Sequence, residues 1–371
     1  MIDPRMATLA KNLVNYSCKV QKGHKVLIEA TGVPEEMICA LVKEIYAVGA
    51  YPYVELGNNR VKRAIMMGAT EDMLKSWADY DSYRMKDMDA YIGIRGGNNS
   101  LELCDVPDEN IQLYSRLYSH PVHHELRVNH TNWVVLRWPT QGMSQQAKMS
   151  TEAFEDLYMK VCTLDYAKMD KAMDPLQELL NKTDKVRITA VDTDLTFSIK
   201  GIGSKKCSGN MNIPDGEIYS APVKNSVNGY IHYNTPSIEN GFEYKDVRLV
   251  FKDGKIVEAT ANNTEGVNKI FDTDEGARYV GEFALGVNPF ITEPMGDILF
   301  DEKIRGSIHF TPGSCYEDCY NGNVSAVHWD LVLIQTPEYG GGEIWFDDVL
   351  IRKDGRFVIP ELECLNPENL M

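Results

Sequence analysis

The hydrophobic pattern of this chain changes once, at the polar stretch of residues 182–185, and this change limits the folds that the chain can adopt. Before it, apolar runs typical of strands alternate with amphipathic stretches of helical period. The expected strands are residues 24–30, 51–56, 90–97 and 133–139. The expected helices are residues 6–17, a segment after Pro34, and an interrupted stretch from 149 to 181. Such alternation is typical of a parallel or mixed sheet covered by helices.

After residue 185 the pattern becomes that of short strands. Strands are expected at residues 186–191 and 195–199. Asp253-Gly254 and Asp354-Gly355 each lie between two apolar runs, and Asp-Gly favours the tight turn of a hairpin. We therefore predict an α/β domain at residues 1–184, which includes the long helical region, followed by an α+β, mainly antiparallel domain at residues 185–371.

The charge of the chain argues against two classes of partner. Acidic residues outnumber basic ones and give a formal net charge of −16, which repels nucleic acid and anionic membrane surfaces. No run approaches the roughly 18 apolar residues of a membrane span, and the N-terminus lacks a signal-peptide core. A cytoplasmic protein without nucleic-acid or membrane partners is the simplest expectation.

The eight cysteines are scattered too widely for a disulfide scaffold and too sparsely for a zinc ribbon. Most are expected to be small buried hydrophobic residues. Cys315 and Cys319 lie close together, but a second cysteine pair is missing, so chance proximity is favoured over a thiolate metal site.

Three histidines, His120, His123 and His124, surround Pro121. Proline interrupts a helix that would align these side chains. We therefore expect them in a loop or a helix cap rather than in a set of metal ligands.

His328 and Asp330 form the most informative polar pair. They interrupt the apolar run of residues 323–334, which is typical of a buried strand, and a period of two places both on one face. A buried carboxylate beside an imidazole needs a cation, a hydrogen-bond network or water. Taken alone, such a pair is more often a satisfied polar pair than a metal site.

Four further segments of the second half each add one metal-ligand residue type. Glu217 follows a turn, Glu282 is expected at the end of a short helix that begins near residue 273, Glu302 lies among apolar residues, and His309 is expected on a strand. With His328 and Asp330, these make four carboxylates and two imidazoles, a set that suits two divalent ions such as zinc, cobalt or manganese. Two such ions can share a bridging hydroxide, which serves hydrolysis. The alternative is that some of these carboxylates lie on solvated helices.

The chain resembles a known family at four segments in order. They read Gly-Glu-Phe-Ala-Leu-Gly (281–286), Leu-Phe-Asp-Glu-Lys-Ile (299–304), Ile-His-Phe-Thr-Pro-Gly-Ser-Cys-Tyr (308–316) and Ser-Ala-Val-His-Trp-Asp (325–330). They are similar to the thermophilic aminopeptidases T, S and II, which are dinuclear metallopeptidases, and the similarity extends over nearly the whole chain. The interval from Glu302 to His309 is two residues longer than in the family pattern.

The resemblance implies a set of site residues. It implies that Glu282 bridges the two ions and acts in catalysis, and that Tyr316, seven residues after His309, is the catalytic tyrosine that donates to the oxyanion. Without the resemblance, we would interpret Tyr316 as a buried aromatic residue of the core. The implied metal ligands are Glu217, Glu282, Glu302, His309, His328 and Asp330.

The resemblance also implies an activity. It implies a metallo-aminopeptidase that releases N-terminal residues from short peptides, with two divalent metal ions per chain, zinc before cobalt or manganese, and a homodimeric assembly. Two alternatives remain open at this point. One is a metallohydrolase of another amide or ester, and the other is a metal-dependent binding protein without turnover.

Overall fold

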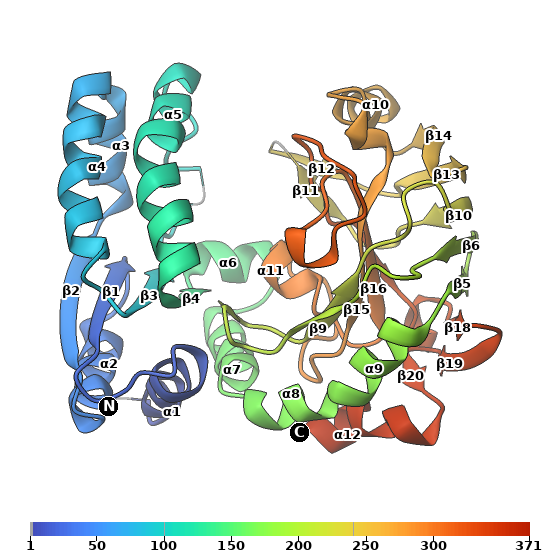
Figure 1. The fold of residues 1–371 in the computed structure, drawn as a ribbon, viewed down its shortest axis with the longest axis horizontal. Helices are drawn as coiled ribbons and strands as arrows, with labels where there is room; N and C mark the ends of the chain where they lie inside the picture. The colour runs from blue at the N-terminus through green and yellow to red at the C-terminus, as the bar shows by residue number, and fades with distance from the viewer. Residues whose placement is uncertain (1–2, 100, 240) are drawn as a thin grey trace. The chain divides into compact units, whose positions relative to one another are not determined.

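The computed structural model describes residues 3–99, 101–239 and 241–371, and Figure 1 shows their fold. The chain divides into two compact units. The first comprises Met1–Thr163 with Gly209–Pro214, and the second comprises Leu164–Ser208 with Asp215–Met371. This division differs from the expected boundary between residues 184 and 185. The physical reason is that residues 164–182 contact the C-terminal segment: the Lys168 ammonium donates to the Met371 carbonyl, and the Cys364 thiol donates to the Ala172 carbonyl.

The first unit contains a five-stranded sheet in the order β2-β1-β3-β4-β8, in which every neighbouring pair is parallel. Its strands are β1 (Lys25–Thr31), β2 (Tyr51–Gly57), β3 (Ala90–Arg95), β4 (Asn132–Arg137) and β8 (Asn212–Ile213). Its helices are α1 (Arg5–Lys11), α2 (Glu35–Ala47), α3 (Asn59–Met67), α4 (Glu71–Met85), α5 (Asp108–Tyr114), α6 (Gln141–Gln146) and α7 (Thr151–Cys162), with wider, π-helical turns at η1 (Asn12–Ser17) and η2 (Ser115–Val128). The expected α/β architecture is confirmed.

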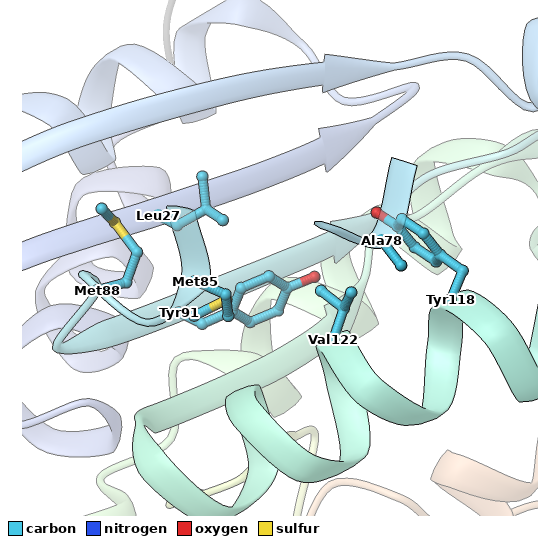
Figure 2. Close-up of a cluster of buried hydrophobic side chains, with 7 residues drawn as sticks. All are labelled: Leu27, Ala78, Met85, Met88, Tyr91, Tyr118 and Val122. Carbon is cyan, nitrogen blue, oxygen red and sulfur yellow. The ribbon is translucent and has the colours of Figure 1, made fainter. Parts of the chain in front are cut away.

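One core cluster of this unit joins the sheet to α4 and η2 (Figure 2). Figure 2 shows Tyr118 and Val122 rising from η2 toward the strand that carries Tyr91. The cluster comprises Leu27, Ala78, Met85, Met88, Tyr91, Tyr118 and Val122. Burial of these apolar side chains holds the two helices on the sheet.

The prediction of a loop around Pro121 is wrong, because Pro121 lies inside η2 together with the three neighbouring histidines. Proline removes one backbone donor from a helix. The burial of Tyr118 and Val122 in the core on either side of it outweighs that loss, since packing of an apolar face supplies most of the stability of a helix in a protein.

The second unit contains two larger antiparallel sheets and a small hairpin. The large sheet has the order β14-β13-β10-β6-β5-β18-β19-β20, and the small sheet has the order β17-β16-β15-β9-β7. The large sheet is built from β5 (Lys185–Ala190), β6 (Thr193–Ser198), β10 (Asn228–His232), β13 (Arg248–Lys252), β14 (Lys255–Thr260), β18 (Gly342–Phe346), β19 (Val349–Lys353) and β20 (Arg356–Phe357). The small sheet is built from β7 (Lys205–Cys207), β9 (Glu217–Ser220), β15 (Val280–Gly286), β16 (Ser307–Pro312) and β17 (Val332–Ile334). The expected α+β, mainly antiparallel architecture is confirmed.

The remaining elements of the second unit are short. The hairpin consists of β11 (Ser237–Glu239) and β12 (Phe242–Tyr244). The helices are α8 (Tyr166–Ala172), α9 (Asp174–Lys182), α10 (Thr264–Phe271), α11 (Ile298–Asp301) and α12 (Pro367–Leu370). Short 3-10 helices are η3 (Gly276–Arg278), η4 (Glu317–Cys319), η5 (Pro337–Tyr339) and η6 (Pro360–Leu365).

Aromatic side chains join the large sheet to the small sheet. Phe197 of β6 contacts Phe283 of β15 and Phe310 of β16, with ring centroids 5.0 Å and 5.1 Å apart. Because side chains alternate along a strand, the neighbours of Phe283 and Phe310 point to the opposite face of the small sheet. That opposite face is where the polar residues of β9, β15 and β16 gather.

No helix in the described part of the chain has both the length and the apolar character that crossing a bilayer requires.

Replacement of Phe310 by alanine is expected to destabilise the protein by about 3–5 kcal/mol, because the ring is fully buried against three other phenylalanines. Urea unfolding, followed by tryptophan fluorescence, measures this loss. Phe242→Ala is the matched control, since that ring is 42% exposed on β12. Equal losses in the two variants would contradict the assignment of Phe310 to the core between the sheets.

Candidate metal centre

Glu217, Glu282 and His309 lie on neighbouring strands of the small sheet, on the face opposite its phenylalanines. All three are buried. The strand register pairs Gly286 with Glu217 and Ala284 with His309, so residues far apart in sequence meet at one place. The sheet therefore brings two carboxylates and an imidazole together where little solvent reaches.

The expectation that Glu282 ends a helix is wrong, because Glu282 lies on β15. All seven residues of this strand are buried. A strand that is covered on both faces has a nearly continuous apolar sequence, and periodicity alone does not separate it from a buried helix. The helical part of this segment is only the single turn η3.

His328 and Asp330 lie on one side of an extended segment, as their spacing predicts, but not within a regular strand. His328 forms an isolated bridge with Gly313, and β17 begins only at Val332. The imidazole Nε2 lies 3.4 Å from the Asp330 carboxylate. The predicted pair is therefore present, although its strand is shorter than expected.

The first set of metal-ligand groups, called here the His328 triad, consists of Glu282, His328 and Asp330. One ligand atom from each lies within 4.8 Å of the others. His328 Nε2 lies 3.3 Å from Glu282 Oε2, and its Nδ1 lies 2.8 Å from the Ser314 carbonyl. Since a carbonyl only accepts, Nδ1 donates a hydrogen bond to the Ser314 carbonyl, and Nε2 is the nitrogen that faces the carboxylates.

This arrangement demands a cation at His328 Nε2. Within the described residues, that buried nitrogen has no hydrogen-bond partner, although two carboxylates face it. Burial lowers the pKa of His328, but Asp330 and Glu282 outweigh burial and raise the pKa to about 11. Either a proton or a metal ion must therefore lie there. One imidazole and two carboxylates suit zinc, manganese or cobalt, and the Thr311 hydroxyl orients Asp330 with a hydrogen bond of 2.7 Å, as in the outer shells of metal sites.

The second set, called here the His309 triad, consists of Glu217, Glu302 and His309. It already contains a cation of the chain itself. The Lys303 ammonium lies 3.0 Å from Glu217 Oε1 and also donates to Glu302 Oε1. Burial lowers the pKa of Lys303, but the charges of Glu217 and Asp215 outweigh it and raise the pKa, so the ammonium stays charged. The three expected ligands of this triad therefore lie together, with the Lys303 ammonium among them.

The two imidazoles differ in their second nitrogen. His309 Nε2 lies 3.1 Å from Glu282 Oε1, and its Nδ1 is buried without a hydrogen-bond partner in the part of the chain that the structure describes. His328 Nδ1, in contrast, is held by the Ser314 carbonyl. Metal-bound histidines almost always have their other ring nitrogen held in this way, so His328 has the orientation of a metal ligand. His309 Nε2 also faces two carboxylates, since it lies 3.4 Å from Glu217 Oε2 as well.

The backbone before Glu217 is shaped by a glycine. Gly216 has a φ of +130°, and a Cβ at this position would lie 2.9 Å from the Asn288 Cβ. The Asn288 amide donates to the Asp215 carbonyl over 2.7 Å. The close approach of these two segments places Glu217 at the start of β9 and facing Lys303.

Tyr316 borders the His328 triad. Its ring centroid lies 4.9 Å from that of His328, and the side chain is 48% exposed. Partial burial, together with the charges of Glu282 and Asp330, raises the pKa of Tyr316. The phenol therefore stays protonated and is able to donate a hydrogen bond to a group bound beside the triad.

Sequence reasoning missed three residues of this cluster. Cys207 and Asp215 form a further group of potential ligands with Glu217, and Lys303 lies inside the His309 triad. A lysine is mostly exposed in proteins, so only its position directly after Glu302 in an apolar segment was a signal. The thiols of Cys315 and Cys319 face carbonyls, those of Asn323 and Tyr219.

Comparisons with known proteins agree with the resemblance. The family described as thermophilic metalloprotease (M29) matches residues 2–357. Aminopeptidase PepS of Streptococcus thermophilus is 25% identical, over 87% of this chain and 86% of that protein, and aminopeptidase T of Thermus aquaticus is 24% identical, over 95% and 98%.

Solved structures support the same fold. Wild-type AmpT from Thermus thermophilus superposes with a TM-score of 0.77 at 20% identity, and covers 96% of this chain and 99% of that one. The 2,5-dihydroxypyridine dioxygenase of Pseudomonas putida KT2440 has a TM-score of 0.62 at 12% identity, with 96% and 98% covered. At these identities the superpositions show the fold alone.

The family match spans nearly the whole chain and confirms both the suspected family and the expected enzyme class, a metal-dependent hydrolase of peptides. The chain belongs to the M29 family of thermophilic metalloproteases.

Proposed function

We propose that this protein is a metal-dependent aminopeptidase that releases the N-terminal residue of short peptides. The observation that carries the proposal is the His328 triad, in which a buried imidazole nitrogen without a hydrogen-bond partner among the described residues faces two carboxylates. Cleavage at the N-terminal end of the peptide is supported by the names of the relatives, aminopeptidases PepS and T.

The chain's own residues divide the remaining work. A divalent ion bound in the His328 triad would supply Lewis-acid polarisation of the scissile carbonyl and activation of a water. In this mechanism Glu282 takes the proton of the attacking water and passes it to the leaving amine. Tyr316 donates a hydrogen bond from its protonated phenol to the developing oxyanion.

The finer features of the expected mechanism stay predictions. These are the hydroxide that bridges two ions, the role of Glu217, Glu302 and His309 as ligands of a second ion, and zinc as the metal. The mechanism above needs only the His328 triad, and none of its steps passes through the His309 triad.

Assembly and location also stay predictions. A homodimer and a cytoplasmic location are proposed from the resemblance. In support of a dimer, β2 is the edge strand of its sheet and exposes Tyr51 and Leu56, which a second copy is able to cover.

The two rival functions differ from an aminopeptidase in how they treat a blocked amine. We expect the protein to cleave a free tripeptide and to lose at least about 100-fold of kcat/KM on the N-acetylated tripeptide, because the α-amine is part of what an aminopeptidase recognises. Release of the first amino acid, followed by chromatography, measures both rates. Equal rates would indicate another amide hydrolase, and no cleavage of either peptide would indicate a binding protein.

The proposed role of Tyr316 is testable by removing one oxygen atom. Tyr316→Phe is expected to lower kcat by about 10²-fold with little change in KM, as for loss of one oxyanion donor. Tyr320→Phe is the matched control, because this nearby tyrosine is 59% exposed and stands outside the triad. Unchanged kcat in Tyr316→Phe would remove this residue from the mechanism, provided that metal content is also unchanged.

Metal binding is expected to release the proton of His328. In the metal-free protein the pKa of His328 is raised from 6.5 to about 11, so the charged ring stabilises the fold fully below pH 6.5 and this stabilisation is lost as the pH rises through about 11. A divalent ion must displace this proton, and its apparent affinity should rise by up to about tenfold per pH unit within that window.

Isothermal titration calorimetry at pH 7.5, in two buffers of different ionisation enthalpy, measures the number of protons released per ion. His328→Ala should abolish this release together with the tight binding. Binding that is independent of pH and releases no proton would contradict the described state of His328.

A further inference from the structure

We propose that the Lys303 ammonium is the permanent cation of the His309 triad, so that each chain binds one catalytic metal ion, in the His328 triad. This inference rests on the proposed function only in assigning catalysis to the His328 triad. It revises the expectation of two ions per chain.

The position of Lys303 is determined by the fold on both sides of the residue. Its backbone N–H donates to the Phe300 carbonyl over 3.0 Å, and its carbonyl accepts from the Asn288 N–H over 3.1 Å. The residue is 1% exposed and lies two positions after the end of α11. The charge of a lysine buried in this way must be paired within the protein.

The ammonium takes one oxygen atom from each of the two carboxylates that a metal ion would bind. It contacts one oxygen of Glu217, at 3.0 Å, and one of Glu302. A divalent ion would have to bind carboxylate oxygens at about 2.0–2.2 Å, which brings a double positive charge close to Nζ in a site of low dielectric. The repulsion between the two cations disfavours their joint presence.

Displacement of the ammonium would not relieve this conflict. If an ion expelled Lys303 from Glu217 and Glu302, a buried charge would lose both of these carboxylates. Loss of one partner of a buried ion pair is strongly unfavourable, because the remaining charge is then neither hydrated nor paired. The triad therefore favours the ammonium that it already holds.

The orientation of His309 gives an independent reason. Its Nε2 lies 3.1 Å from Glu282 Oε1, where it donates a hydrogen bond to the carboxylate instead of offering a lone pair to an ion. Of the two imidazoles, only His328 has its second nitrogen held by a carbonyl, that of Ser314. We therefore assign His309 as a positioning residue that orients Glu282, and His328 as the metal ligand.

Metal content tests the inference without any assay of activity. Protein loaded with excess zinc and freed of unbound ion by gel filtration is analysed by native mass spectrometry and by elemental analysis. The expected contents are one zinc per chain for the wild type, none for Asp330→Asn, one for Glu302→Gln and two for Lys303→Met, whose side chain has similar length without charge.

Two zinc ions in the wild type, or one remaining in Asp330→Asn, would overturn the inference. A Lys303→Met variant that folds but still holds one ion would show that Lys303 is not what excludes the second. If this variant does not fold, the wild type, Asp330→Asn and Glu302→Gln decide the question by themselves. Glu302→Gln tests the triad directly, because a two-ion site would lose an ion and a one-ion site would not.

Failure of this inference is distinguishable from failure of the proposed function. A protein with one zinc that cleaves no free peptide refutes the aminopeptidase and leaves the metal assignment intact. A protein with two zinc ions that cleaves free peptides but not acetylated ones refutes the metal assignment and leaves the aminopeptidase intact.

Discussion

Repulsion among carboxylates on one side of the small sheet is the constraint on which the site depends. Glu217, Glu282 and Asp215 are buried, and Glu302 and Asp330 are nearly so. Like charges this close, with little water between them, do not remain ionised unless cations lie among them. The chain supplies Lys303 for Glu217 and Glu302. For Glu282 and Asp330 it supplies the rings of His309 and His328, and the free nitrogen of His328 requires a proton or a metal ion.

The two faces of the small sheet have separate tasks, and the strand period connects them. Phe283 and Phe310 bind the small sheet to the large one, and this packing determines which way every neighbour on β15 and β16 points. Glu282 directly precedes Phe283, and His309 directly precedes Phe310, so both side chains face the site. A register slip of one residue would place the phenylalanines in the polar cluster and the charges between the sheets. The same strand register therefore determines both the packing of the core and the geometry of the site.

Much of this arrangement could be predicted from the sequence, and there are physical reasons why the rest could not. The spacing of His328 and Asp330 predicts one face, since a period of two survives even where the strand is only an extended segment. Glu282 was placed on a helix because a strand buried on both faces carries no alternation. The expected boundary after residue 184 followed a polar stretch, whereas the actual division follows the contacts of α8 and α9 with the C-terminal segment.

The inward position of Lys303 could not be predicted from its neighbours. Its orientation depends on Asn288 and Glu217, which are distant in sequence and meet Lys303 only through the folded sheet. The family resemblance identified the residue types of both triads, and the six expected ligand residues do fall into the two triads, with Glu282 beside His309. A resemblance of this kind describes which residues recur, while the charge balance of one particular chain depends on residues outside the shared pattern.

The most direct test of the account is a crystal structure of the zinc-loaded wild-type protein, with anomalous difference data collected on both sides of the zinc absorption edge. The account predicts one anomalous peak, bounded by Glu282, His328 and Asp330, with the Lys303 ammonium still between Glu217 and Glu302. A second peak within the His309 triad, or a single peak there and none beside His328, would contradict it.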